Sequence, residues 1–286
     1  MPLADELVEC RRTGTLGQRR RIRKPLPGRI GKEIAHGAKY AQPVSRREQT
    51  GLEDELGPIL PGPGASDYER YLRTDELLAL QKTEAERAHH DELLFQVTHQ
   101  SSELWLKLGA AEVETATAEL RAGDLRAAIR SLRRTILALK LIIEQLDMLE
   151  LMSPWEYTSG VRPVLGHGSG FDSPGWNEMR RVVPVAGEAF HELRRAEGLS
   201  LADVYRLARD HEDLYELAET LIELDERAVT WRIRHIRVVE RIIGGEVVGT
   251  QGTPVELLAG LTHRKLFPEL WDVRNELTEL AKEDER

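Results

Sequence analysis

The sequence contains a single cysteine, Cys10, and therefore cannot form a disulfide within the chain. It has no CxxC or CxxCH pair, which excludes the common cysteine-based zinc sites and covalently attached haem. No run approaches about 18 consecutive apolar residues, and the N-terminus lacks the apolar core of a signal peptide. These absences predict a soluble, cytoplasmic protein without a membrane partner.

Aromatic residues are also scarce, at 5% of the chain. No segment of useful length alternates apolar and polar residues with the period of a strand, and no internal repeat is present. The glycine-rich stretches contain neither a GxGxxG nor a Walker pattern, so no nucleotide site is indicated. What remains is a chain of long segments with helical periodicity, which predicts an all-α fold.

Charge is distributed unevenly along the chain. The net charge is −9, yet the first 50 residues carry 12 Lys and Arg against 5 Asp and Glu. The basic run 19–24 is the pattern of a nucleic-acid contact, but no aromatic residues for base stacking accompany it. We therefore expect no nucleic-acid partner, and expect the basic segment to lie on the acidic body or on a neighbouring subunit.

Composition divides the chain into a basic, Pro- and Gly-rich arm over residues 1–65 and a helical domain over 66–286. Ser66 followed by Glu69 is the pattern of a helix capping box. From there the periodicity predicts a short helix near 66–80 and further helices over 91–121, 125–151, 176–197, 201–209, 211–243 and 254–280. Irregular, glycine-rich loops are expected over 157–175 and 244–253.

His235 lies in the middle of an apolar stripe, since Trp231, Val238 and Val239 share its helix face. A histidine in such a place is most often a core residue hydrogen-bonded to a neighbour. The alternative is a neutral imidazole presented to a metal in an apolar pocket, as in a haem axial ligand. The arginines around it would then meet acidic groups such as haem propionates.

Two further places carry candidate chemistry. Phe95 and His99 lie one turn apart on a helix, an arrangement that lines a pocket for a flat ring and offers an acid or base. Arg162 stands in the irregular loop near Tyr157, where a guanidinium suits recognition of a carboxylate. A polar network between helices and a surface arginine are the plain structural alternatives.

Several blocks in one order carry a resemblance over about residues 68–280. They are Tyr71-Leu72 with Asp75 to Leu78, His90 to Phe95, His99 to Leu108, Arg162 with Val164 to His167, Ser169 to Phe171, Trp231-Arg232 with Arg234-His235, Gly249-Thr250, and Phe267 to Trp271 with Arg274. Together they resemble the tryptophan 2,3-dioxygenase superfamily. No single block is specific, but the set in this order is.

The resemblance implies a helical bundle that encloses haem b and oxygenates an aromatic amino acid. It makes His235 the proximal ligand of the iron, and His99 the catalytic histidine facing the substrate ring. It assigns cofactor contacts to Trp105, Ser169, Gly170 and Trp231, and substrate contacts to Phe95, Tyr157, Arg162 and Thr250. It also implies a homo-oligomer, a dimer or a tetramer, in which the N-terminal arm reaches a neighbour's site.

Three departures from the family pattern bear on the substrate. One extra residue separates Tyr157 from Arg162, the second glycine loop reads Gly249-Thr250-Gln251-Gly252-Thr253, and the stretch between Ser173 and Trp231 looks shortened. On this basis we expect hydroxylation of L-tyrosine to L-DOPA, driven by hydrogen peroxide, in natural-product biosynthesis. The alternative is O2-dependent conversion of L-tryptophan to N-formylkynurenine. Oxidation of a modified tryptophan to an oxindole, and a non-enzymatic helical protein with a binding arm, are further alternatives.

Overall fold

The computed structural model describes residues 57–249, 252, 260 and 262–284. The chain divides into two compact units, Met1–Pro61 and Gly62–Arg286, and the helices of the described residues belong to the second. These residues contain no β-strand, so the predicted all-α class is confirmed. Their helices also include none that is long and apolar enough to cross a membrane. The division into an arm over 1–65 and a domain over 66–286 stays a prediction.

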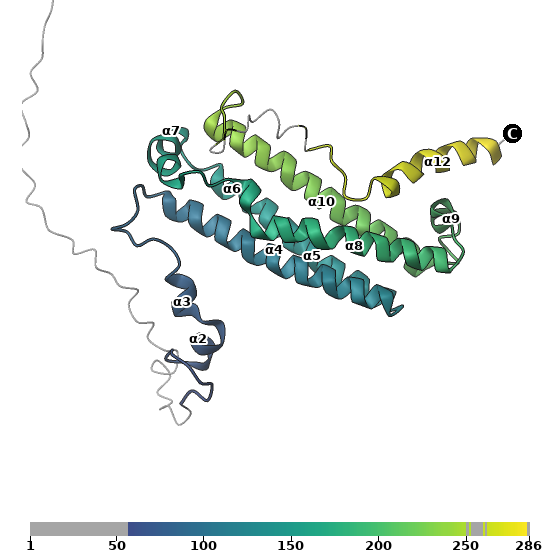
Figure 1. Ribbon diagram of the computed structural model, residues 1–286, viewed down its shortest axis with the longest axis horizontal. Helices are drawn as coiled ribbons and strands as arrows, with labels where there is room; N and C mark the ends of the chain where they lie inside the picture. Colours follow the sequence, from purple (N-terminus) through teal and green to yellow (C-terminus); the bar gives the residue numbers. More distant parts are fainter. Residues whose placement is uncertain (1–56, 250–251, 253–259, 261, 285–286) are drawn as a thin grey trace, which may run out of the picture. The chain divides into compact units, whose positions relative to one another are not determined.

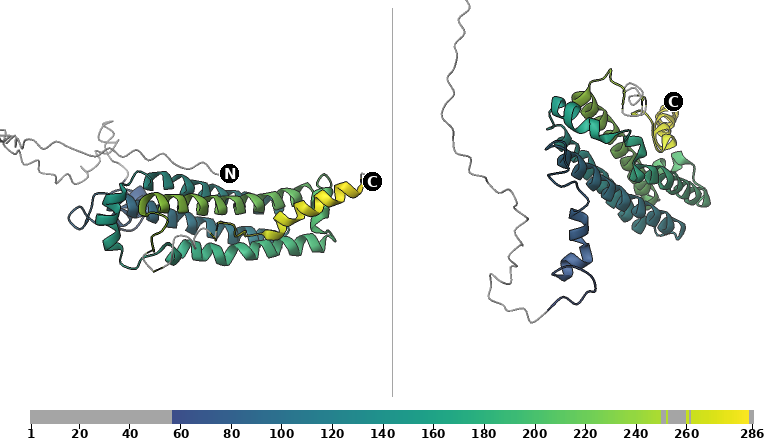
Figure 2. Two further views of the ribbon diagram at one scale, coloured as in Figure 1. Left: turned by 90° about the horizontal axis from the view of Figure 1, so that it is seen from above. Right: turned by 60° about the vertical axis from the view of Figure 1, so that its left-hand side comes forward.

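Four long helices lie alongside one another, as the two views of Figure 2 show together with Figure 1. They are α4 (Glu92–Arg121), α5 (Leu125–Glu144), α8 (Pro174–Ala196) and α10 (Glu212–Ile243). Helix α4 packs along α5 and α8, and α5 packs along α10. The predicted helices over 91–121 and 211–243 agree with α4 and α10 to within a residue.

The main core of the second unit lies between these long helices. Aliphatic side chains at helical spacing point inward, so that Val113, Leu132, Leu217 and Leu221 have no solvent exposure. Each such side chain contributes about 1.5–3 kcal/mol when fully buried. A second, smaller hydrophobic cluster joins α6 (Leu146–Leu149) to the C-terminal part of α10.

Local signals define where several helices begin. The predicted capping box is confirmed at α2 (Asp67–Leu72): Ser66 Oγ accepts from the Glu69 amide at 3.3 Å, and the Glu69 carboxylate accepts from the Ser66 amide at 3.0 Å. A left-handed Arg73 then separates α2 from α3 (Thr74–Leu78). Between α4 and α5, Asp124 caps the new helix by accepting from the Ala127 amide at 2.9 Å.

The stretch after α5 departs from the expected pattern in two ways. The helix predicted over 125–151 ends at Glu144, and α6 follows as a separate turn. The loop predicted over 157–175 instead contains helical turns, which directly follow α7 (Pro154–Glu156). They are the π-turn η1 (Tyr157–Val161), η2 (Arg162–Leu165) and, after a break, η3 (Gly170–Asp172). The fully buried Val161 anchors these turns in the smaller hydrophobic cluster.

The helix predicted over 254–280 is interrupted, because residues 262–267 are not helical. Helix α12 (Pro268–Asp284) begins at Pro268, and residues 254–259 of the prediction lie outside the described residues. Asp225, which is fully buried on α10, explains the start. Its Oδ2 accepts from the Leu266 amide at 2.9 Å, the Phe267 amide at 3.1 Å and Trp271 Nε1 at 2.9 Å. One carboxylate oxygen thus satisfies the amides that precede the helix. Helix α9 (Leu201–Arg206) also packs on α12.

Candidate functional site

Helix α10 presents His235 beside a tryptophan stack. Because residues four apart share a helix face, the Trp231 ring lies against the His235 ring, with centroids 4.8 Å apart and planes 11° from parallel. The other contact of Trp231 is Trp176 on α8, at 4.4 Å between ring centroids. Trp231 packs against both hydrophobic clusters, so the stack fixes the orientation of His235 where the two clusters meet.

The surroundings of His235 favour the neutral imidazole. Burial, and to a lesser extent the neighbouring charge of His99, lowers the pKa of His235 to about 4. Among the described residues none is hydrogen-bonded to the His235 ring. The expected alternative, a core histidine bonded to a neighbour, therefore finds no partner in the described part of the chain. At neutral pH His235 is an uncharged ring, and no described residue occupies its nitrogen lone pair.

Helix α4 supplies Phe95 and His99, and the two rings pack with centroids 4.0 Å apart. His99 Nδ1 lies 2.7 Å from the Phe95 carbonyl oxygen. Because a carbonyl only accepts, Nδ1 carries the proton, and Nε2 of the neutral ring is an acceptor. Burial lowers the pKa of His99, opposed by this hydrogen bond and by the charge of Glu103. Solvent still reaches the His99 side chain.

Tyr157 and Arg162 come to the same end of the bundle from the π-turn. The Tyr157 ring lies 6.0 Å from Phe95, centroid to centroid. Burial raises the pKa of the Tyr157 phenol, and the nearby charge of Arg162 opposes the shift. The Arg162 guanidinium donates to the Val248 carbonyl through Nη2 at 2.7 Å, and no described residue accepts from its other N–H donors. Helix α4 and the turns η1 and η2 thus gather an aromatic pair, a histidine and a guanidinium.

Ser169, Gly170 and Trp105 lie apart from these direct contacts. Ser169 caps η3, where its Oγ accepts from the Phe171 amide at 3.3 Å, and Gly170 is the first residue of that turn. Trp105 packs against the main core. Thr250 lies outside the described residues. The assigned roles of these four residues stay predictions.

Two of the arginines around His235 form ion pairs within the chain. Arg234 forms ion pairs with Asp147 and with Glu150, the latter at 3.0 Å, and Arg241 pairs with Glu150 at 3.3 Å. Both guanidinium groups therefore pair with carboxylates that α6 and the residue after it bring to this face of α10. Contact of these arginines with external acidic groups stays a prediction.

Glu103 and Trp176 are the residues that sequence reasoning missed. Glu103 lies within the recognised block His99 to Leu108, and Trp176 begins the helix predicted over 176–197. Only the packing of α4, α8 and α10 places the two residues next to the site. Glu103 follows His99 by four residues and shares its helix face, which is the one signal that was available.

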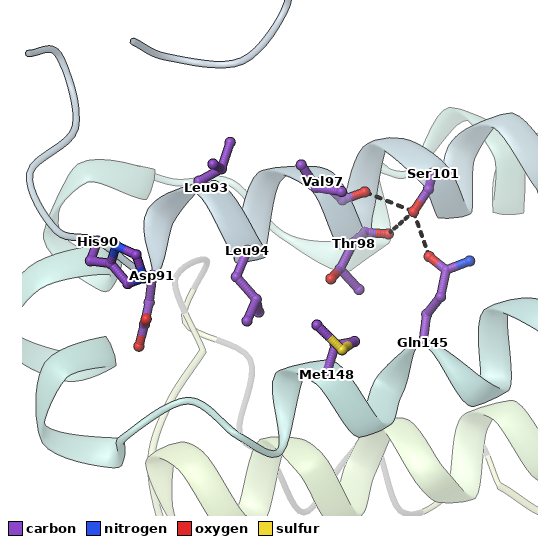
Figure 3. A pocket seen from close by; sticks show the side chains of 9 residues that line it. All are labelled: His90, Asp91, Leu93, Leu94, Val97, Thr98, Ser101, Gln145 and Met148. Atoms are coloured by element: carbon purple, nitrogen blue, oxygen red, sulfur yellow. Dashed lines mark hydrogen bonds between the residues drawn. The ribbon is translucent and has the colours of Figure 1, made fainter. Parts of the chain in front are cut away.

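A separate hollow of about 450 Å³ lies beside the start of α4 (Figure 3). Apolar side chains make up much of its lining, including Leu94, Val97 and Met148. No predicted site residue lines it. Val97 and His99 point to opposite sides of α4, because two residues rotate by about 200° around a helix. The hollow is therefore distinct from the candidate site.

Comparison with known proteins accounts for this arrangement. The tryptophan 2,3-dioxygenase family model matches residues 61–185 and 181–277. The chain belongs to the tryptophan 2,3-dioxygenase family. The predicted superfamily is thereby confirmed, and membership supports the predicted class of haem-dependent oxygenase.

Three bacterial relatives illustrate how much of the chain is shared. A tryptophan 2,3-dioxygenase of Caulobacter vibrioides is 34% identical over 73% of this chain and 98% of its own length. Those of Myxococcus xanthus and Erythrobacter litoralis are each 33% identical. The match with the Myxococcus xanthus protein covers 78% of this chain and 94% of that protein. The match with the Erythrobacter litoralis protein covers 72% of this chain and 97% of that protein.

These relatives overturn the expected tyrosine hydroxylation. That prediction relied on the departures from the family pattern, among them the shortened stretch between Ser173 and Trp231. Proteins named tryptophan 2,3-dioxygenase nevertheless match this chain at 30–34% identity over 72–88% of its residues, which favours the tryptophan alternative. The natural-product role and the peroxide oxidant depended on the same reading and are likewise unsupported.

Proposed function

We propose that this protein is a haem b-dependent dioxygenase that converts L-tryptophan and O2 to N-formylkynurenine. The observation that carries the proposal is a pair of neighbouring histidines on two different helices. His235 on α10 and His99 on α4 are close enough for the charge of one to lower the pKa of the other. The family and the names of the relatives support tryptophan as the substrate.

The chemistry of His235 and its surroundings fits a residue that would hold a haem. An iron ligand of this kind is a neutral imidazole with a free lone pair. His235 meets both requirements, and Trp231 keeps its ring in one orientation. We assign further cofactor contacts to Trp105, Ser169 and Gly170. When bound, the haem supplies the redox chemistry that activates dioxygen for cleavage of the indole ring.

His99 is suited to receive the indole N–H. The Phe95 carbonyl holds the Nδ1 proton, so Nε2 is the acceptor available to a substrate. The lowered pKa of His99 keeps this nitrogen unprotonated at neutral pH. Packing on Phe95 at 4.0 Å orients the imidazole ring and provides one wall for a flat substrate.

Arg162 is suited to hold the substrate carboxylate. It keeps one N–H on the Val248 carbonyl and has further donors for a bidentate contact. Tyr157 lies between Phe95 and the charge of Arg162 and closes the wall on that side. We assign contact with the substrate ammonium or carboxylate to Thr250, which comes soon after the Val248 contact in sequence.

We further propose a homo-oligomer in which the arm over residues 1–65 reaches a neighbouring subunit. Helix α4 leaves a stripe of apolar side chains in solvent, namely Leu93, Val97, Leu104 and Leu108, each at least 36% exposed. A stripe of this kind is typical of a surface that another chain covers. Light scattering of the full chain and of a form without residues 1–65 tests the proposal. An unchanged monomer in both contradicts it.

The activity itself is tested with haem-loaded protein, L-tryptophan and O2 under reducing conditions. We expect the absorbance of N-formylkynurenine to appear with tryptophan, and no DOPA with tyrosine and peroxide. His99→Ala should lower kcat by about 10²–10⁴-fold while haem content is retained. Protein that carries haem but forms no N-formylkynurenine would contradict the proposal.

A further inference from the structure

Glu103, on α4, reaches across to the first residues of α8. The Ser173 hydroxyl donates to Glu103 Oε1 at 2.5 Å, and the Gly175 amide donates to Oε2 at 2.8 Å. Both oxygens of one carboxylate thus receive a donor from the same short segment, 70 or more residues away in sequence. Because the acceptor is charged, these hydrogen bonds are stronger than neutral ones.

The backbone at Gly175 lies directly against α4. A Cβ added there would lie 2.5 Å from the Leu106 Cβ and 2.8 Å from Glu103 Oε2. The first distance joins two Cβ atoms, which are fixed to the backbone and cannot move apart unless one of the helices shifts. Glycine therefore permits the close approach, and the Glu103 carboxylate fixes its register.

The same segment continues to the ring stack of the candidate site. Ser173 Oγ, while donating to Glu103, accepts from the Trp176 amide at 3.1 Å and so caps α8. The Trp176 ring lies 4.4 Å from Trp231, whose ring stacks on His235. A continuous series of contacts runs from Glu103 to His235 across three helices.

We propose that Glu103 is a positioning residue that joins the His99 helix to the aromatic stack behind His235. His99 precedes Glu103 by one helical turn, so one carboxylate contacts the start of α8 while its helix carries the substrate-facing histidine. This inference relies on the proposed function only for what the two histidines do. The contact of α4 with α8 itself is independent of haem.

Glu103 also acts on His99 through its charge. Its carboxylate raises the pKa of His99 against the larger, opposing effect of burial. Among the described residues, the charge of Glu103 on α4 acts on His99, and the charge of His99 acts in turn on His235 on α10. Removing the charge of Glu103 should lower the pKa of His99 further, which keeps Nε2 unprotonated to a lower pH.

The first test measures backbone hydrogen exchange in the haem-free protein. In Glu103→Gln an amide NH2 replaces one carboxylate oxygen and the charge is lost, so the amides of Gly175 and Trp176 should exchange about tenfold faster or more. Glu112→Gln is the matched control, because Glu112 also lies on α4 and pairs with another helix, through Arg134. Unchanged exchange over residues 171–178 in Glu103→Gln would overturn the proposal, whatever the protein catalyses.

The second test compares Glu103→Gln with Ser173→Ala in the haem-loaded protein. Both should alter the spectrum of the histidine-bound haem, because both loosen the support of Trp176. Only Glu103→Gln should also shift the acid limb of the pH–activity profile to lower pH. A spectrum identical to wild type in both variants counts against the proposal, as does an acid limb that moves upward in Glu103→Gln. Failure of wild-type protein to bind haem would refute the proposed function, and the exchange experiment would still decide the role of Glu103.

Discussion

The main core of the bundle and the end of the bundle that carries His99 and His235 contain different kinds of side chain. Between α4, α5, α8 and α10 the buried side chains are mostly aliphatic and many have no solvent exposure. At the end that carries His99 and His235 the rings are aromatic or titratable, and most are only partly buried. The first region stabilises the fold by excluding water. In the second, no described residue is hydrogen-bonded to His235 or to Nε2 of His99, which leaves these nitrogens available for a ligand.

Replacing His235 should show most clearly that haem binding and thermal stability depend on different regions of the bundle. In His235→Ala the Soret band of haem-loaded protein should be lost completely, while the melting temperature of the haem-free protein stays close to that of wild type. The reason is that His235 has no hydrogen-bonded partner among the described residues. Absorbance and thermal unfolding of the same preparation measure both. A variant that binds haem as wild type would remove His235 from the site.

A core leucine should show the opposite behaviour. Leu217 has no solvent exposure, and Leu217→Ala should lower the free energy of unfolding by about 2–5 kcal/mol. In conditions where the variant stays folded, its Soret position and its KM for tryptophan should match wild type. Urea unfolding with parallel kinetics tests this, and a changed KM at full folding would show that the two regions are coupled.

Asp225 tests a polar group inside the aliphatic region. Asp225→Ala leaves the amides of Leu266 and Phe267 and the Trp271 indole N–H without their acceptor, and should destabilise the protein by about 3 kcal/mol. In Asp225→Asn the side-chain oxygen can still accept, and the NH2 takes the place of Oδ1, which has no hydrogen-bond partner. We expect a loss of about 1 kcal/mol there. Equal losses in the two variants would contradict this account.

The smallest effect concerns pH and the haem-free protein. The folded pKa of His235 is about 4, below the value near 6.5 of an unfolded chain. Between these two values the unfolded state binds the extra proton, so stability falls as pH falls from about 6.5 toward 4. Urea unfolding at several pH values should show this slope in wild type and a reduced slope in His235→Gln. An equal slope in both would assign it to other groups.

Much of the site could be predicted because its parts are local. Phe95 and His99, and Trp231 and His235, are pairs at i, i+4 on amphipathic helices, and the predicted neighbours do pack together. The order of the recognised blocks indicated the family correctly. The substrate was predicted wrongly, because a segment judged short by general appearance says nothing about which atoms line the pocket.

Other parts could not be predicted because they join distant segments. The ion pairs of Arg234 depend on where α6 lies, and nothing in the helix of Arg234 indicates it. The π-turn over Tyr157–Val161 has no periodic pattern of its own, and it follows from the burial of Val161. In each case the deciding energy comes from contacts across the bundle, and local propensity is only a weak guide.

The sequence by itself determined the all-α class, the bounds of α4 and α10 to within a residue, the cap at Ser66, and the faces on which His99 and His235 lie. These features follow from side chains that are near neighbours along the chain, so periodicity and local hydrogen bonds suffice to specify them. Only the tertiary structure decided that Glu103 contacts the start of α8, that Trp176 lies against Trp231, and that α12 begins at Pro268 beneath Asp225. Those contacts arise when the helices pack and bury polar groups that must then find partners wherever the fold brings them.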